Sequence, residues 1–199
     1  MIAALFVRTN GVYFNLAGVD PWDKSRDARK YLGPNPVIAH PPCERWGRYW
    51  SGGPSAKVKR ELGDDDGCFE SALISVRLWG GVLEHPEASK AFAYFGLGKP
   101  KRSGGWTWSN QGWICCVEQG HYGHLARKAT WLYYCGDNPP ELRWGPCSNK
   151  MRLDEGFRSA EHRKMARDSG QRPIKRLSKN QNIDTPIPFR DLLISMVTR

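Results

Sequence analysis

Short apolar runs alternate with turn-forming residues in the first part of the chain. Met1–Val7 predicts a buried strand, and Gly11–Leu16 predicts a short second strand or a turn. Asp20-Pro21 is typical of a helix start, so a helix is expected from there to about Leu32. Val37–His40 predicts the next strand. This order of strand, turn, helix and strand is typical of a parallel sheet.

The central part of the chain continues the alternation of helices and strands. Asp64–Asp66 can cap a helix that reaches about Trp79, because the apolar residues that follow keep helical spacing. Gly81–Glu84 predicts another strand, and a short helix is expected near Ala88–Phe95. Trp113–Glu118 and Thr130–Cys135 predict a further pair of strands. The pattern as a whole predicts an α/β protein.

Length and composition divide the chain into two regions. A chain of 199 residues is long enough for one ordinary domain with an appendage. We expect the domain to span residues 1–147. Residues 148–199 form a basic C-terminal extension in which a basic helix and linker at 157–179 precede a closing amphipathic helix at Phe189–Val197. Residues 44–63 and 96–112 are rich in glycine, tryptophan and basic side chains and are expected to be mobile loops.

The formal charge of +10 and the nine tryptophans indicate a polyanionic partner, with DNA the leading candidate. The alternative is that the charge serves solubility and the indoles fill the core. No apolar run is long enough to cross a membrane, and Met1–Val7 lacks the features of a leader, so a cytoplasmic protein is expected.

The six cysteines lack the close paired spacing of a disulfide or zinc scaffold, so reduced thiols are expected. One alternative is a zinc site built from Cys115, Cys116, His121 and His124. Adjacent cysteines on a strand point to opposite faces, which disfavours that site.

Cys43 is the strongest candidate for chemistry. The strand Val37–His40 ends at Pro41-Pro42, and these two prolines stiffen the backbone and place Cys43 at the carboxyl end of the strand, where α/β proteins gather ligands. The positive charges of Arg45 and Arg48 are expected to lower the pKa of the thiol. The alternative is an inert structural cysteine.

Three motifs occur in a fixed order: Pro41-Pro42-Cys43, then Leu83-Glu84-His85-Pro86, then Tyr122-Gly123 with Lys128-Ala129-Thr130-Trp131-Leu132 downstream. Together they resemble the DNA cytosine C-5 methyltransferases, and most closely the short phage-type members. The resemblance spans residues 36–145. It implies a compact Rossmann-like, mostly parallel sheet flanked by helices, and an enzyme that methylates cytosine in DNA, in a bacterial host cytoplasm if phage-encoded.

The resemblance also implies roles for individual residues. Cys43 supplies the thiolate that adds to carbon 6 of cytosine, and Glu84 shares a proton with ring nitrogen 3 and the exocyclic amine. A cation near the carbonyl at position 2 would stabilise the intermediate, and Arg127 is the first choice, with Lys128 second.

The target base has to leave the duplex for this chemistry, so further residues must grip the DNA. The expected nucleic-acid contacts are Arg45, Arg48, Lys99, Lys101, Arg102, Trp106, Trp108, Lys128, Arg172, Lys175 and Arg176.

The methyl donor implied by the resemblance is S-adenosylmethionine. Its expected contacts are Phe6, Asn10, Gly11, Asp20, Asp23 and Pro41. The turn after the first strand keeps only Gly11 and contains Arg8, which departs from the glycine-rich pattern of the family. Two alternatives therefore stay open: a non-catalytic DNA-binding relative with a protection or anti-defence role, and another base-modifying enzyme on the same scaffold.

Overall fold

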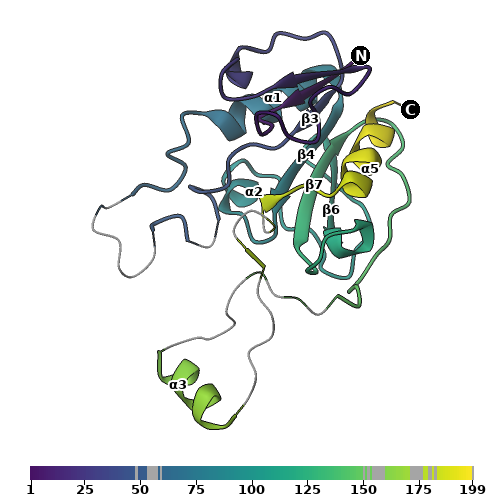
Figure 1. The fold of residues 1–199 in the computed structure, drawn as a ribbon. Helices are drawn as coiled ribbons and strands as arrows, with labels where there is room; N and C mark the ends of the chain where they lie inside the picture. Colours follow the sequence, from purple (N-terminus) through teal and green to yellow (C-terminus); the bar gives the residue numbers. More distant parts are fainter. Residues whose placement is uncertain are drawn as a thin grey trace.

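A mixed sheet of seven strands runs through the part of the chain that the computed structural model describes (Figure 1), which comprises residues 1–47, 49–52, 58, 60–149, 151, 153, 160–170, 177, 178, 181 and 183–198. The strands are β1 (Ile2–Leu5), β2 (Val19–Trp22), β3 (Val37–Ala39), β4 (Gly81–Pro86), β5 (Thr107–Ser109), β6 (Gly112–Glu118) and β7 (Ala129–Cys135).

The strand order is β2-β1-β3-β4-β7-β6-β5. The first four strands are parallel, whereas β7 is antiparallel to both β4 and β6, and β5 is antiparallel to β6. The α/β class is confirmed, but the expectation of a mostly parallel sheet is wrong. The reason is that β6 and β7 are joined only by a short 3-10 turn, η2 (Gln119–Tyr122), and a few further residues. Such a short connection joins antiparallel neighbours, because parallel strands need a long crossover.

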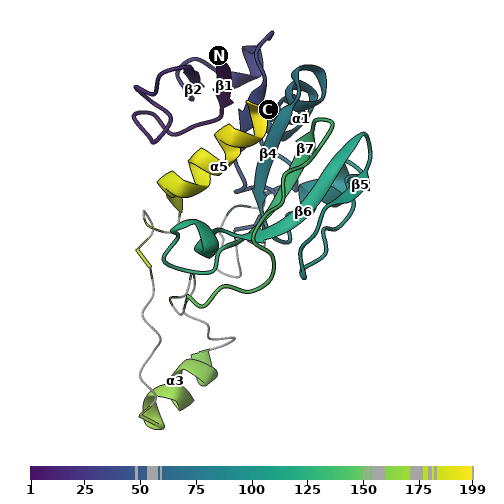
Figure 2. The same cartoon turned by 90° about the vertical axis from the view of Figure 1, so that its right-hand side faces the viewer.

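Helices cover both faces of the sheet. Helix α1 (Cys68–Trp79) packs on one face, where Phe69 and Val76 join Leu83 of β4 in a buried cluster. The short α2 (Lys90–Tyr94) adds Phe92 to the same cluster. Helix α5 (Ile187–Val197) packs on the other face, and Figure 2 shows it lying across the sheet. Neighbouring residues of one strand alternate between the two clusters, as a strand buried on both sides requires.

Most predicted elements are confirmed within a few residues, but the helix expected from Asp20 to Leu32 is wrong. That stretch holds strand β2 and a single 3-10 turn, η1 (Ala28–Lys30). The Asp23 carboxylate accepts hydrogen bonds from the Ser25 and Arg26 amides, which closes a local turn instead of starting a helix. Because β2 is an edge strand, it tolerates Pro21. Gly11–Leu16 forms turns.

The two segments expected to be mobile loops are anchored at tryptophans. Trp46 is buried in the α1 cluster and donates to Asp65 over 2.7 Å. In the second segment, Trp106 donates to the Pro140 carbonyl over 2.7 Å, and β5 follows directly.

The basic C-terminal region contains α3 (Ala160–Asp168), which lies away from the sheet in both views (Figures 1 and 2). The last helix, α5, contributes Phe189, Leu193 and Met196 to the core and so belongs to the same folded body as the sheet. None of the described helices is long and apolar enough to cross a membrane.

Candidate active site

The three sequence motifs meet on one side of the sheet, at the carboxyl ends of the parallel strands. We call this side the carboxyl edge. Cys43 follows the carboxyl end of β3, and Glu84 lies near the carboxyl end of β4. Because β7 runs antiparallel to β4, with Pro86 paired with Thr130, the residues just before β7 lie at this same edge. The topology thus brings Cys43, Glu84 and Lys128 together from segments far apart in the chain.

Side chains from three elements hold the Glu84 carboxylate in place. His40 Nδ1 lies 3.0 Å from Oε2, and Gln119 Nε2 donates to Oε1 over 3.2 Å. Gln119 also donates to the Thr130 hydroxyl over 2.8 Å. Behind His40, the Tyr13 hydroxyl lies 2.9 Å from Nε2. Glu84 is therefore fixed from β3, from η2 and, through His40, from the loop after β1.

Burial favours the neutral form of Glu84, but its partners outweigh burial. The hydrogen bond from His40, and the charges of His40 and Lys128, hold the pKa of Glu84 below its ordinary value. Glu84 is consequently a carboxylate at neutral pH and can accept a proton.

Cys43 opens a tight turn. Its carbonyl accepts hydrogen bonds from the amides of Trp46 and Gly47, and the buried Trp46 ring anchors that turn. The residue is exposed as a whole, yet partial burial of the sulfur, followed by the charge of Glu84, raises the pKa of the thiol, while Lys128 opposes this rise. The expected lowering of the pKa is therefore wrong, because burial and the charge of Glu84 outweigh the opposing charge of Lys128. Arg48 lies outside the described residues.

Lys128 supplies the positive charge at this edge. Its ammonium donates to the Asp184 carbonyl over 3.1 Å, and its backbone has a left-handed φ of 38°. Burial lowers the pKa of Lys128, and the charges of Glu84 and Cys43 act against that lowering. The charges of Lys128 and of both candidate reactive side chains therefore act on one another.

Arg127, the first choice for the cation, is engaged elsewhere. Its Nε donates to Glu118 over 2.9 Å, and Glu118 also accepts from Arg102 over 3.0 Å. The structure therefore favours the second choice, Lys128, because its charge acts on Glu84 and Cys43.

The two acidic residues expected to contact the methyl donor already have partners. Both oxygens of Asp23 accept hydrogen bonds, from Thr9 on one side and from Ser25 and Arg26 on the other. The bond from Thr9 is the largest of the causes that lower the pKa of Asp23 to about 2. Asp20 accepts from the Trp22 indole over 2.7 Å and pairs with Arg26.

The other residues expected to bind the methyl donor lie in the loop after β1 and at the end of β3. Phe6 and Asn10 adopt left-handed φ values of 58° and 55°, and Phe6 packs against the α1 cluster. A Cβ at Gly11 would lie 2.8 Å from the Arg8 carbonyl, so the loop needs glycine for its own closure. Pro41 is buried.

Strand order reverses between β1 and β3, where sheets of this kind bind ligands. The Tyr13 to His40 contact bridges this point. Because Asp20 and Asp23 are satisfied internally, they do not fit the role of ribose-binding carboxylates in S-adenosylmethionine recognition.

The residues expected to contact nucleic acid differ in their surroundings. Lys99, Lys101 and Trp108 are exposed, with Trp108 packed edge-on against Trp113. In contrast, Arg102 pairs with Glu87 and Glu118, and Trp106 is bonded to Pro140. Arg45 is partly buried beside Cys43, and Arg172, Lys175 and Arg176 lie outside the described residues.

The zinc alternative finds no support among the described residues. Cys115 belongs to the buried cluster on the α5 face of the sheet, and Cys116 belongs to the cluster on the α1 face. The two thiols therefore lie on opposite faces of the sheet. No group of three or more potential ligands in the described part of the chain could hold a metal ion.

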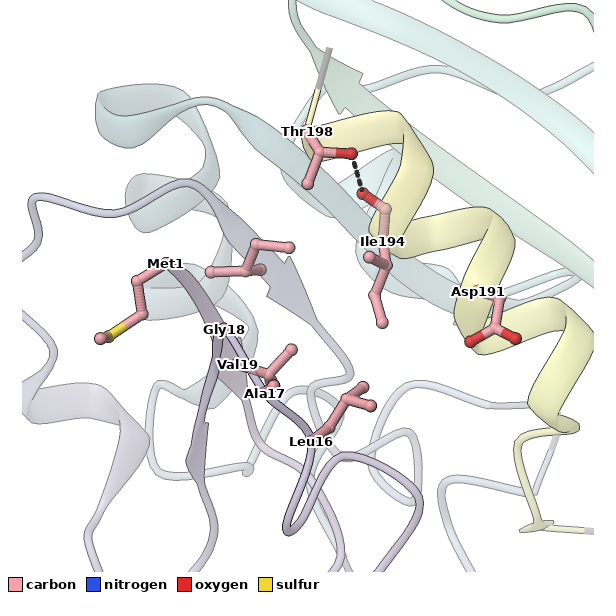
Figure 3. A pocket seen from close by; sticks show the side chains of 9 residues that line it. Met1, Leu16, Ala17, Gly18, Val19, Asp191, Ile194 and Thr198 are labelled. Carbon is pink, nitrogen blue, oxygen red and sulfur yellow. Dashed lines mark hydrogen bonds between the residues drawn. The ribbon is translucent and has the colours of Figure 1, made fainter.

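A hollow of about 360 Å³ lies at the other end of the strands (Figure 3), between the start of β1 and β2 and helix α5. It is lined mainly by apolar groups such as Met1, Val19 and Ile194, with Asp191 its charged residue. Glu84 and Cys43 lie at the opposite, carboxyl edge, so this hollow is not part of the candidate site.

Sequence reasoning gave no role to four members of the site, Tyr13, His40, Gln119 and Thr130, although Thr130 lies within the third motif. His40 gave a signal, because a polar residue at the carboxyl end of an apolar strand lies where open α/β sheets bind ligands. Tyr13 gave none, since only the folded chain brings it to His40.

No protein-family model matches this chain, and no curated protein or solved structure shows significant similarity to it.

Proposed function

We propose that this protein modifies pyrimidine bases in DNA, cytosine above all, through a covalent bond between Cys43 and carbon 6 of the base. The observation that carries the proposal is the convergence of a thiol, a carboxylate and a cation at one strand edge, with the charges of Glu84 and Lys128 both acting on Cys43. The net charge of +10 and the exposed Lys99, Lys101 and Trp108 suit a polyanionic, base-bearing substrate.

The residues support a balanced addition step. The Cys43 thiol gives its proton to the Glu84 carboxylate, and the sulfur electron pair forms the bond to carbon 6. The electrons of the bond between carbons 5 and 6 move through carbon 4 onto nitrogen 3. Nitrogen 3 then takes up from Glu84 the proton that Cys43 released. Lys128 stabilises negative charge that develops toward the carbonyl at position 2. Carbon 5 thereby becomes a nucleophile.

A DNA cytosine C-5 methyltransferase with a Rossmann-like fold is the member of this class that the three motifs favour. S-adenosylmethionine would supply an electrophilic methyl group for carbon 5. We confine the proposed steps to base activation, because the acidic residues assigned to the donor are satisfied internally.

The test follows hydrogen exchange at carbon 5, which needs no methyl donor. Addition at carbon 6 lets carbon 5 take up deuterium from heavy water, so a cytosine-containing oligonucleotide, single-stranded or duplex, should gain deuterium with the unaltered protein. Cys43→Ser should lower the rate at least about a thousandfold, as expected for loss of a nucleophile. Cys68→Ser, at the start of α1, is the matched control and should keep the rate.

Equal exchange by Cys43→Ser and the unaltered protein would show the assignment of the nucleophile to be wrong. In the presence of S-adenosylmethionine, DNA containing 5-fluorocytosine should form a denaturant-resistant complex only when Cys43 is present, if methyl transfer follows addition.

A second candidate function is a non-catalytic DNA-binding protein that keeps the base pocket. The hydrogen bonds that Asp20 and Asp23 already accept from the chain itself favour it, because these two carboxylates were the acidic residues expected to bind the methyl donor. DNA binding without deuterium uptake, and without measurable S-adenosylmethionine binding, would select this candidate.

A further inference from the structure

His40 lies between two side chains that fix both of its ring nitrogens. Nδ1 is 3.0 Å from Glu84 Oε2, and Nε2 is 2.9 Å from the Tyr13 hydroxyl. The His40 and Glu84 side chains are each only 14% exposed, and Tyr13 is 3% exposed. The arrangement is a built one, since it joins the loop after β1 with the ends of β3 and β4.

Hydrogen positions follow from the partners. A carboxylate only accepts, so Nδ1 carries the hydrogen in the contact with Glu84. Burial raises the pKa of Tyr13, so its hydroxyl stays protonated; it can donate to Nε2 of a neutral ring or accept a hydrogen bond from Nε2 of a charged one. With either ring form, Tyr13 holds the imidazole so that Nδ1 faces Glu84.

We propose that His40, oriented by Tyr13, is a positioning residue that keeps Glu84 ionised and aimed for proton exchange between Cys43 and the base. This inference rests on the proposed function and adds to the three motif residues a device that none of the motifs contains. Gln119 also orients Glu84, but His40 is the partner that controls the charge of the carboxylate.

The physical reason is a balance between burial and hydrogen bonding. Burial raises the pKa of Glu84, and the bond from His40 is the first of the effects that bring it down. The other charged or titratable groups that act on Glu84 are Lys128, before β7, and His85, its neighbour in β4; Glu84 in turn acts on Cys43. Arg190 and Asp191 of α5 act on Tyr13, behind His40. Without His40, the pKa of Glu84 should rise, and the carboxylate should be lost at a higher pH.

Two substitutions separate positioning from packing. His40→Phe keeps a ring but removes the donor, whereas His40→Asn places an amide nitrogen near the position of Nδ1 and keeps one. Each protein is labelled with carbon-13 at the glutamate carboxyl, and the Glu84 signal, assigned with Glu84→Gln, is titrated by nuclear magnetic resonance. Deuterium uptake at carbon 5 of cytosine is measured over the same pH range.

His40→Phe should raise the midpoint of the Glu84 titration by about one pH unit or more, the size expected for losing one charge-assisted hydrogen bond. The acid limb of the exchange rate should move by the same amount. His40→Asn keeps the hydrogen bond but not the charge of the ring, so its midpoint should lie between those of the unaltered protein and His40→Phe, and Tyr13→Phe should shift both readouts in the direction of His40→Phe by less. Tyr13→Phe also serves if His40→Phe fails to fold.

Unchanged Glu84 midpoints in both His40→Phe and Tyr13→Phe would overturn the proposal, and so would equal loss of exchange in His40→Phe and His40→Asn at every pH. If the midpoints shift as expected while the unaltered protein exchanges no deuterium, the coupling of His40 to Glu84 stands and the proposed function fails. The two failures are therefore distinguishable.

Discussion

The two halves of the carboxyl edge of the sheet carry similar polar residues but use them differently. Asp20 within β2 and Asp23 just after it accept hydrogen bonds from residues close in the chain, including Arg26, and Asp23 also accepts one from Thr9 in the loop after β1. At the ends of β3 and β4, Glu84 is held by residues distant in the chain and acts on a cysteine. The first half closes turns, whereas the second half sets the charge states of groups that can react.

The difference shows how a carboxylate that stabilises a turn can be distinguished from one that can take part in a reaction. Bonds from the chain's own turns and loops, as at Asp23, where Thr9 on one oxygen and Ser25 and Arg26 on the other engage both oxygens, lower the pKa of the carboxyl. Opposed effects, as at Glu84 and Cys43, place a proton acceptor beside a protonated nucleophile.

Lowering the pH should remove the stabilising contributions of the two groups of residues in different pH ranges. This loss of folding stability is the largest effect that we expect. Burial lowers the pKa of His85, in the β4 half, from 6.5 to about 4, so the folded protein holds it neutral. The unfolded chain binds that proton first, and stability present above pH 6.5 is therefore lost as the pH falls toward 4, by about 3 kcal/mol. Urea unfolding at pH 7, 5.5 and 4 measures the loss.

The β2 half should respond only at lower pH. The pKa of Asp23 is lowered from 3.8 to about 2, so its contribution is present above pH 3.8 and is lost as the pH falls toward 2. His85→Leu should flatten the upper window and leave the lower one. Persistence of the upper window in His85→Leu would contradict the assignment.

A smaller effect tests the charges that act on the Cys43 thiol at the ends of β3 and β4. Glu84 raises the pKa of the Cys43 thiol and Lys128 lowers it, so removing each charge should move thiol reactivity in opposite directions. Glu84→Gln should speed alkylation of Cys43 by iodoacetamide at pH 7.5 about three- to tenfold, and Lys128→Gln should slow it by a similar factor. Peptide mass mapping follows Cys43, with Cys68 as the internal reference. Changes in the same direction for both variants would show that the charges do not act on the thiol.

The elements with strong periodicity could be predicted from the sequence, and those set by local turns or pairing could not. Helix α1 and strands β4, β6 and β7 follow their apolar patterns. Strand β2 was hidden because Asp20-Pro21 is also a helix-start signal, and only pairing with β1 makes it a strand. The short connection between β6 and β7 does require antiparallel pairing, which the alternation of helices and strands obscured.

The site divides along a similar line. Cys43 and Glu84 were identifiable as residue types at strand ends, which needs no side-chain geometry. The choice between Arg127 and Lys128 was not, because adjacent residues differ in direction and only the position of Glu118 decides which one is engaged. His40 and Tyr13 became partners through a contact between two segments that the sequence does not link.

The smallest effect tests whether the β1 and β2 half is purely structural. Thr9→Val removes one hydrogen bond to Asp23, and it should lower the melting temperature by about 2–4 °C because the loop after β1 loses its tie to the turn after β2. Thr107→Val, in strand β5, is the control. Deuterium uptake at cytosine should stay within about twofold, since neither Thr9 nor Asp23 contacts Glu84 or His40 through a hydrogen bond in the described chain. A large fall in uptake by a folded Thr9→Val protein would show that the two halves of the edge work as one site, and the contrast between a structural half and a reactive half would have to be given up.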